Sequence, residues 1–203
     1  MSDLKLEAKT ALNLDQPVEE HWAGFSFVEI TGENYWWLAA SRGGEEKLSR
    51  RCEKHLGAAL PEPRRFSRGK SGGASVDLLW AGERQWMIAG ALPDLPSSTG
   101  KAGYLTDQSD GWVAFTVSGS KTRNVLEKLC QLDLHPASFP DGACARMAVE
   151  GMIAIIACED SDEPRYRLML QRSSARSMAG HIRHAAFSTC GEKIEAPSAP
   201  AAV

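Results

Sequence analysis

The sequence of 203 residues has no long uncharged apolar run and no large excess of charge of either sign. A helix that crosses a bilayer needs about 20 consecutive apolar residues. The first residues, MSDLKLEAKTALNLDQ, are charged throughout and lack the apolar core of a secretory signal. A formal net charge of -3 gives no general attraction to nucleic acid or to an anionic membrane. These features predict a soluble, cytoplasmic protein with neither a nucleic-acid partner nor a membrane partner.

The sequence also lacks paired cysteines. Its five cysteines form an odd set with wide gaps and no C-x-x-C pair: Cys52, Cys130, Cys144, Cys158 and Cys190. This pattern fits neither a disulfide framework nor a zinc site. We therefore expect mostly buried, unreactive thiols and no metal in this chain. A redox or nucleophilic cysteine is the alternative, and it would need a nearby histidine that the sequence alone does not place.

Nucleotide-binding fingerprints are absent or incomplete. No G-x-G-x-x-G occurs, so a dinucleotide-binding fold has no signature here. Gly69, Lys70 and Ser71 match the end of a phosphate-binding loop, but Arg64 stands where the earlier glycine is required. A strand, not a helix, is also expected after this segment, which is the wrong context for such a loop. The sequence therefore predicts no cofactor-binding residue.

Candidate catalytic residues are few. His135 follows Asp133 and precedes Pro136, but no serine lies in an elbow motif that an Asp–His base would activate. Proline favours an extended backbone at the residue before it, so we interpret His135 as a turn residue bonded to backbone. His181 and His184 share a predicted helix without a third ligand, and solvent-facing side chains explain them better. We predict no catalytic residue and no metal ligand.

The hydrophobic pattern is typical of an α+β fold with antiparallel sheets packed with helices. The two-residue turn at Glu150 and Gly151 requires antiparallel neighbours. Expected strands are residues 24–30, 35–40, 75–80, 85–89, 112–117, 144–149, 152–158 and 165–170, and expected helices are residues 45–59, 120–130 and 174–187. The polar segment PEPRRFSRGKSGG between the first helix and the first hairpin is expected to be a mobile surface loop.

The expected organisation is two small interleaved subdomains. Residues 1–23 form an N-terminal extension, residues 24–100 the first α+β subdomain, residues 101–187 the second, and residues 188–203 a disordered tail. The boundary is placed in the linker LPDLPSSTGKAG, which is rich in proline, serine and glycine. The tail ends in APSAPAAV, a composition that favours disorder.

The most informative segment is LCQLDLHPASFPDGACA, residues 129–145, which we call the connector. The preceding SGSKTRNVLEKLC predicts a helix whose first turn is capped by Ser120. Pro136 and Pro140 then mark two turns. Because apolar Leu132, Leu134 and Phe139 lie between the turns, we expect a fixed loop.

The connector pattern C-x-L-D-L-H-P-x-x-F-P-x-G-x-C-A resembles the gamma subunit of heterotetrameric sarcosine oxidase. The resemblance extends to SVDLLWAGERQWMIAG and RYRLMLQRSSARSMAGHI, so that it covers roughly residues 74–184, and it is looser before that. It implies the folate-binding-domain fold of the glycine-cleavage aminomethyltransferase. It also implies a non-catalytic assembly subunit of a complex that oxidatively demethylates sarcosine to glycine, forming hydrogen peroxide and 5,10-methylenetetrahydrofolate.

The resemblance further implies which partners and cofactors to expect. The partners would be the alpha, beta and delta subunits. FAD, FMN, NAD and tetrahydrofolate would bind in those subunits, with zinc as a further candidate in the small one, and no cofactor would bind in this chain. The alternative is a free-standing folate-binding protein of the same fold. The repair proteins of that fold carry a K-G-C-Y-x-G-Q-E type signature, which this sequence lacks.

Candidate subunit contacts come from exposed aromatic and basic character. Six tryptophans are many for this length, and such rings usually lie in cores or interfaces. In an extended segment Trp36 and Trp37 point to opposite sides, so one should face outward. The basic loop around Phe66 is either solvated or meets an acidic patch of another subunit, and an anionic ligand is a further alternative. The candidate contacts are Trp36, Trp37, Arg64, Arg65 and Arg68, together with connector residues Leu132, Asp133, Leu134, His135, Pro136, Phe139 and Pro140.

Overall fold

The computed structural model describes residues 9–90, 95 and 100–195. One sheet contains β1 (Glu19–Trp22), β2 (Phe25–Ile30), β8 (Trp112–Ser118), β9 (Cys144–Val149), β10 (Met152–Asp160), β11 (Arg165–Gln171) and β12 (Lys193–Ile194). The other contains β3 (Asn34–Ala40), β4 (Phe66–Ser71), β5 (Ala74–Gly82), β6 (Gln85–Gly90) and β7 (Gly103–Asp107). The helices are α1 (Glu45–Leu56), α2 (Thr122–Leu126) and α3 (Ala175–Cys190), and 3-10 turns occupy Gly100–Ala102, Ser109–Gly111 and Arg172–Ser174.

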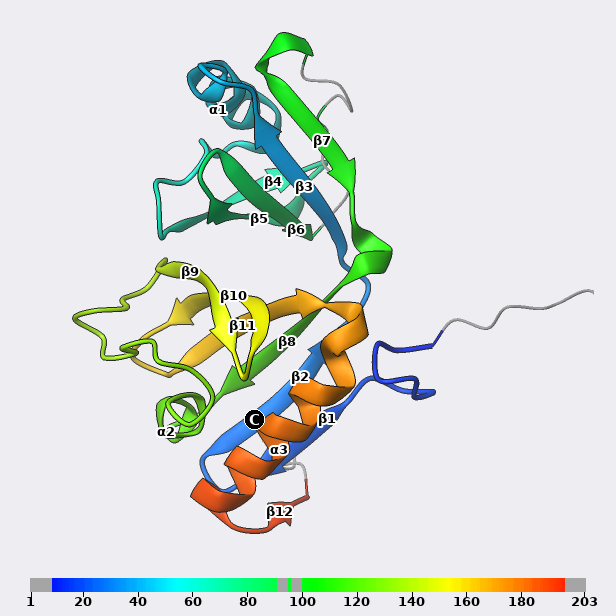
Figure 1. Cartoon of the computed structure of the whole chain (residues 1–203), viewed down its shortest axis with the longest axis vertical. Coiled ribbons are helices and arrows are strands. Elements are labelled where there is room, and N and C mark those ends of the chain that lie inside the picture. Colours follow the sequence, from blue (N-terminus) through cyan, green and yellow to red (C-terminus); the bar gives the residue numbers. More distant parts are fainter. Residues whose placement is uncertain (1–8, 91–94, 96–99, 196–203) are drawn as a thin grey trace, which may run out of the picture.

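Both sheets are antiparallel throughout their described pairs. The larger sheet has the strand order β12-β1-β2-β8-β11-β10-β9, and the smaller has the order β4-β5-β6-β3-β7. Figure 1 shows the smaller sheet above the larger one, with α1 at the upper end and α2 and α3 beside the larger sheet. The predicted α+β fold with antiparallel sheets is confirmed.

Three apolar cores separate four layers. The largest core lies between the larger sheet and α2, α3 and the connector, and includes Phe27, Phe115 and Ile182. A second core lies between the two sheets and includes Met87 and Met169. The third lies between the smaller sheet and α1. Each sheet therefore buries both of its faces.

The local sequence explains most of these elements. In β2 the burial alternates residue by residue, with Phe25 and Phe27 in the largest core. In α1, Leu48, Cys52 and Leu56 recur at every fourth position and are buried, as the predicted amphipathic helix requires. This helix ends at Gly57, whose φ of 67° is the left-handed conformation that glycine adopts readily.

The turn between β9 and β10 has the predicted two-residue form. Glu150 has a φ of 47° and Gly151 a φ of 75°. Two successive positive φ values are the requirement of a tight hairpin turn whose twist matches its strands. Met152 accordingly pairs with Val149, directly across the turn.

Three expected elements differ from the structure. Strand β4 lies in the segment predicted to be a mobile loop, and it pairs with β5 along its whole length, from Phe66 opposite Leu79 to Ser71 opposite Ala74. Strand β7 begins within the predicted linker and pairs with β3. Helix α2 is shorter than predicted, and its N-cap is Lys121, not Ser120, with no side-chain cap. In the two strands, pairing with a strong neighbour outweighs a weak local propensity.

The two sheets interleave along the chain more deeply than the expected division at residue 100. Strand β2 belongs to the larger sheet, although it precedes that division, and β7 belongs to the smaller sheet, although it follows it. The expected N-terminal extension contains β1, and the first residues of the expected tail complete α3 and form β12. Most of the predicted linker and the last eight residues of the tail, 196–203, lie outside the described residues.

Candidate functional site

The connector is held in place from both sides, as predicted. Leu134 and Phe139 are buried in the largest core, and the Phe139 ring stacks on Tyr166 with centroids 6.4 Å apart. From α2, the Arg123 Nε donates to the Leu134 carbonyl at 3.1 Å and to the Tyr166 hydroxyl at 3.0 Å. The Arg123 guanidinium also donates to the Ser161 carbonyl. One arginine thus joins α2, the connector and the turn between β10 and β11.

The connector presents an exposed edge between these anchors. Asp133, His135, Pro136 and Pro140 are exposed, whereas Leu132 is half-buried. The His135 N–H donates to Asp133 Oδ1 at 3.0 Å, and His135 Nδ1 accepts from the Ala137 N–H at 3.2 Å. Hydrogen bonds from the Ser138 hydroxyl and from the His135 N–H lower the pKa of Asp133. The carboxylate therefore bonds to the Ser138 hydroxyl and to backbone, and the His135 imidazole bonds to the Ala137 N–H, as predicted for a turn histidine.

Trp36 and Trp37 lie on opposite faces of β3, and both are half-buried. Trp36 packs beside the core under α1. Trp37 faces the larger sheet, where its ring lies 5.9 Å from the Trp112 ring and 5.4 Å from the Arg146 guanidinium. A subunit contact at either side chain stays a prediction.

Backbone hydrogen bonds join the predicted basic loop to the end of the connector. The Arg64 carbonyl accepts from the Cys144 N–H at 2.8 Å, the Phe66 N–H donates to the Gly142 carbonyl at 2.9 Å, and Arg65 forms an isolated bridge with Ala143. The expectation of a mobile segment is therefore wrong. Backbone pairing with a distant part of the chain fixes it. The side chains of Arg64 and Arg65 remain exposed.

Arg68 belongs to a charge cluster between the sheets, which contains Glu33, Arg68, Asp77, Glu159, Arg165 and Arg167. Arg167 lies at its centre. The Arg167 guanidinium donates to Glu33 Oε2 at 2.8 Å and to Glu159 Oε1 at 3.0 Å, and its Nη2 lies 3.3 Å from Asp77 Oδ2. Arg68 Nε donates to Asp77 Oδ1 at 3.2 Å. The cluster therefore links β4, β5, β10, β11 and the segment between β2 and β3.

The centre of the cluster is buried, and the formal charges of the cluster balance. The side chains of Arg167, Asp77 and Glu159 are only 10%, 11% and 10% exposed. Burial raises the pKa of Asp77, although Arg167 and Arg68 act in the opposite direction. Because three arginines face three carboxylates, no charge is left over to attract a ligand. The ion pairs of the cluster therefore join the two sheets. Because Arg68 already pairs within the cluster, it is less available for a partner than the sequence suggested.

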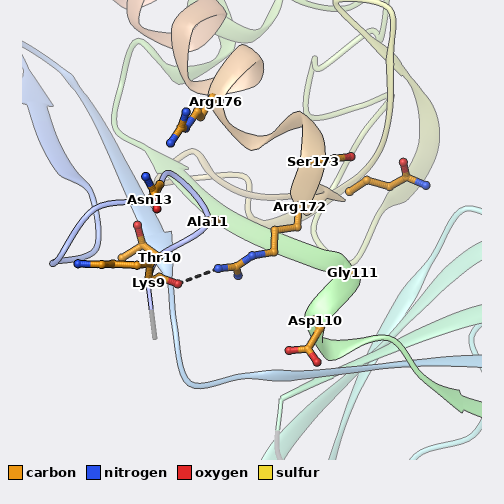
Figure 2. Close-up of a pocket in the computed structure, with 10 residues that line it drawn as sticks. Lys9, Thr10, Ala11, Asn13, Asp110, Gly111, Arg172, Ser173 and Arg176 are labelled. Atoms are coloured by element: carbon orange, nitrogen blue, oxygen red, sulfur yellow. Dashed lines mark hydrogen bonds between the residues drawn. The ribbon is translucent and has the colours of Figure 1, made fainter. Parts of the chain in front are cut away.

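A solvent-open hollow of about 880 Å³ lies at the start of α3. In Figure 2, Arg172 lies beside Lys9 and Thr10 of the N-terminal segment, and Arg176 lies above Asn13. Arg172 donates to the Lys9 carbonyl at 2.7 Å, and Arg176 donates to the Leu12 carbonyl at 3.3 Å. The hollow is rich in positive charge, but the arginines already hold the N-terminal segment.

The cysteines and the two histidines of α3 are the remaining candidates. Burial raises the pKa of Cys52 and of Cys144 to about 12, and burial with the Asp141 charge raises that of Cys158 to about 11. These three thiols are buried, as predicted, and protonated at neutral pH, whereas Cys130 and Cys190 are half-buried. His181 and His184 are exposed, and His181 Nδ1 lies 3.5 Å from a Glu150 carboxylate oxygen.

Two searches of the described residues bear on metals and membranes. Among residues 9–90, 95 and 100–195, no group of three His, Cys, Asp or Glu side chains is placed to hold a metal ion. Within the same ranges, no helix combines the length and the apolar character needed to span a bilayer.

Comparison with known proteins gives matches at the level of structure. No protein-family model matches the sequence, and no curated protein sequence matches it. The structure of heterotetrameric sarcosine oxidase from Corynebacterium sp. U-96, in complex with pyrrole 2-carboxylate, contains a similar chain. The TM-score is 0.67 with 17% identity, over 84% of this chain and 87% of that one.

A second similar structure is the glycine cleavage system aminomethyltransferase T from Bartonella henselae. The TM-score is 0.58 with 12% identity, over 79% of this chain and 46% of that one. The chain thus spans about half of the aminomethyltransferase but nearly the whole of the sarcosine oxidase chain. At these identities the comparisons show the fold, which is that of aminomethyltransferase-type folate-binding domains.

Proposed function

We propose that this chain is the gamma-type, non-catalytic subunit of a heterotetrameric sarcosine oxidase. The observation that supports the proposal most is the match of nearly the whole chain to nearly the whole of one chain in that complex. Similar coverage of the two chains, 84% and 87%, means that they are of similar length. The match to the aminomethyltransferase leaves half of that enzyme without a counterpart. The connector resemblance is independent support, since it rests on sequence and not on backbone shape.

In this proposal the chain supports the assembly of the complex and takes no part in catalysis. Its partners are the alpha, beta and delta subunits, in the cytoplasm, and FAD, FMN, NAD and tetrahydrofolate bind in those subunits. Four of the exposed connector residues, Asp133, His135, Pro136 and Pro140, form the proposed contact, because buried anchors on either side fix their position. Binding to a pre-fixed loop avoids the entropy cost of ordering it. The whole complex, not this chain, oxidises sarcosine.

The test is recovery of the complex from the native host. The tagged chain should be recovered with larger chains whose flavin absorption is bleached by sarcosine. Recovery of a colourless chain without partners would overturn the proposal.

The contact is tested by a matched pair of variants. The double variant His135→Ala with Pro136→Ala should recover less flavin per tagged chain than the wild type. Asp162→Ala with Glu163→Ala, in the exposed turn after β10, should recover as much. An equal yield from both variants would remove the connector from the interface.

The second candidate is a free-standing folate-binding protein. The fold shared with the aminomethyltransferase favours it, and the positively charged hollow of Figure 2 offers a place for the ligand's carboxylates. Calorimetric titration of the full chain with tetrahydrofolate tests it directly. Saturable binding that weakens in Arg172→Ala would support this candidate, and no heat of binding would exclude it.

A further inference from the structure

A second hollow lies on the outer side of the smaller sheet, far from the connector in sequence. This groove of about 510 Å³ is open to solvent and runs between α1, the segment after it and the β5–β6 hairpin. Its apolar walls are Leu60, Pro61, Pro63, Trp80 and Trp86. Trp80 and Trp86 are direct cross-strand partners, so their indoles lie side by side on one face of the sheet.

The walls of the groove are held rigid. Trp86 is 7% exposed, and its Nε1 donates to the Pro61 carbonyl at 3.1 Å. The Leu60 N–H donates to the Ser49 hydroxyl of α1 at 3.1 Å. Two hydrogen bonds thus tie the proline-containing segment to the sheet and to the helix. A groove that is already formed needs little reorganisation to accept a ligand.

The rim of the groove is acidic. Glu45, Glu46, Glu62 and Glu83 surround it, and Arg84 is its one basic side chain. Arg50 of α1 pairs with Glu46, so that four carboxylates and two guanidinium groups leave a formal charge of -2. Among the described residues Glu62 has no ion-pair partner. The charge of the rim therefore favours a cationic occupant.

Arg84 adds a requirement for a hydrogen-bond acceptor. Its Nε is buried and has no hydrogen-bond acceptor among the described residues, and it lies 3.9 Å from Glu45 and 3.8 Å from Glu83. A buried donor without an acceptor costs free energy. The Arg84 side chain as a whole is 38% exposed, so a carbonyl oxygen of an occupant can accept from its outer N–H groups.

We propose that the groove binds a segment of another protein that carries lysine or arginine beside proline or aliphatic residues. The basic head meets the glutamates, its aliphatic stem lies on the indole faces, and a backbone carbonyl accepts from Arg84. A simple ammonium ion would supply the charge but not the carbonyl, which is why a polypeptide fits better. This inference stands whether or not the chain belongs to a sarcosine oxidase.

The test starts with a display library of short random peptides, selected on the immobilised full chain. The enriched peptides should carry basic residues beside proline or aliphatic ones. Each is then synthesised with arginine or with its neutral analogue citrulline, and binding is followed by fluorescence anisotropy. The citrulline peptide should bind at least about tenfold more weakly, and added salt should weaken the arginine peptide.

Matched variants assign the binding to the groove. Glu62→Gln with Glu83→Gln should lower the affinity for the arginine peptide by about tenfold. Asp162→Asn with Glu163→Gln removes the same number of exposed charges elsewhere and should leave it unchanged. Enrichment of non-basic peptides, no enrichment, or equal binding to both variants would each overturn the proposal. If sedimentation showed that the chain forms a dimer and that Trp80→Ala disrupts this dimer, a second copy of the chain would occupy the groove. That result would also overturn the proposal.

Discussion

The helix-covered faces of the two sheets are closed to different degrees. On the larger sheet, α2, α3 and the connector together cover the face and bury Phe27, Phe115, Phe139 and Tyr166 almost completely. On the smaller sheet α1 is the one described helix over the face, and the groove remains open beside it. The larger sheet is thus covered on this face by elements of the same chain. The smaller sheet leaves Trp80 half-buried in the open groove, so the two sheets should respond differently to the loss of an aromatic ring.

The largest expected effect is at Phe139. Phe139→Ala removes a ring that is 1% exposed and stacked on Tyr166, and it should lower the free energy of unfolding by about 4 kcal/mol. Trp80→Ala removes a larger ring from the open groove, where half-burial gives less stabilisation, and should cost about 1 kcal/mol. Urea unfolding followed by far-UV circular dichroism measures both. Equal losses would show that the groove is as much a part of the core as the connector.

The next effect concerns the junction between the two sheets. Arg167→Met removes the cation at the centre of the charge cluster and leaves Glu33, Asp77 and Glu159 facing one another with less compensation. Breaking a buried ion pair by removing one partner costs about 3 kcal/mol or more. Unfolding by urea at neutral pH should show this loss, and it should shrink in acid, where the carboxylates are protonated.

Arg165→Met is the matched control for the cluster. Arg165 lies 3.4 Å from the same Glu159, but its side chain is 46% exposed. An exposed pair contributes roughly 0 to 1 kcal/mol. If both variants lost the same free energy of unfolding, the burial of Arg167 would not explain how the cluster stabilises the junction between the sheets.

Sequence reasoning succeeded where the pattern was local. The spacing of Leu48, Cys52 and Leu56 predicted α1, and the turn at Glu150 and Gly151 predicted an antiparallel hairpin. Proline and apolar anchors predicted a fixed connector. In each case the deciding residues lie within a few positions of one another, so the sequence itself shows the geometry.

Sequence reasoning failed where distant parts of the chain decide. Strand β4 has a glycine and basic residues at its centre, and only its pairing with β5 makes it a strand. The charge cluster was missed because Glu33 and Arg167 are 134 residues apart. A buried arginine within an apolar strand, as in RYRLML, was the available signal. The groove could not be predicted from the sequence either, because its walls come from α1, the segment after it and the β5–β6 hairpin, which only the fold brings together.

The smallest effect tests an edge of the larger sheet instead of its centre. Glu20 of β1 accepts from Arg183 of α3 at 2.9 Å and from Lys193 of β12 at 2.9 Å. Burial alone would raise the pKa of Glu20, but these two partners outweigh it and hold the pKa below its ordinary value of 4.5. The ionised carboxylate therefore stabilises the fold at pH values above about 4.5, and this stabilisation is lost as the pH falls through the lower folded-state pKa.

Glu20→Gln should accordingly cost about 1 kcal/mol near neutral pH, because it weakens two charge-assisted hydrogen bonds at a partly exposed site. The difference from the wild type should narrow in acid, where the wild-type carboxylate is protonated as well. Urea unfolding at a series of pH values measures both quantities, with Glu163→Gln, at an exposed turn, as the neutral reference. A difference that stayed constant with pH would mean that Glu20 acts by packing. In that case the ion pair with Lys193 would not be what stabilises β12 at the edge of this sheet.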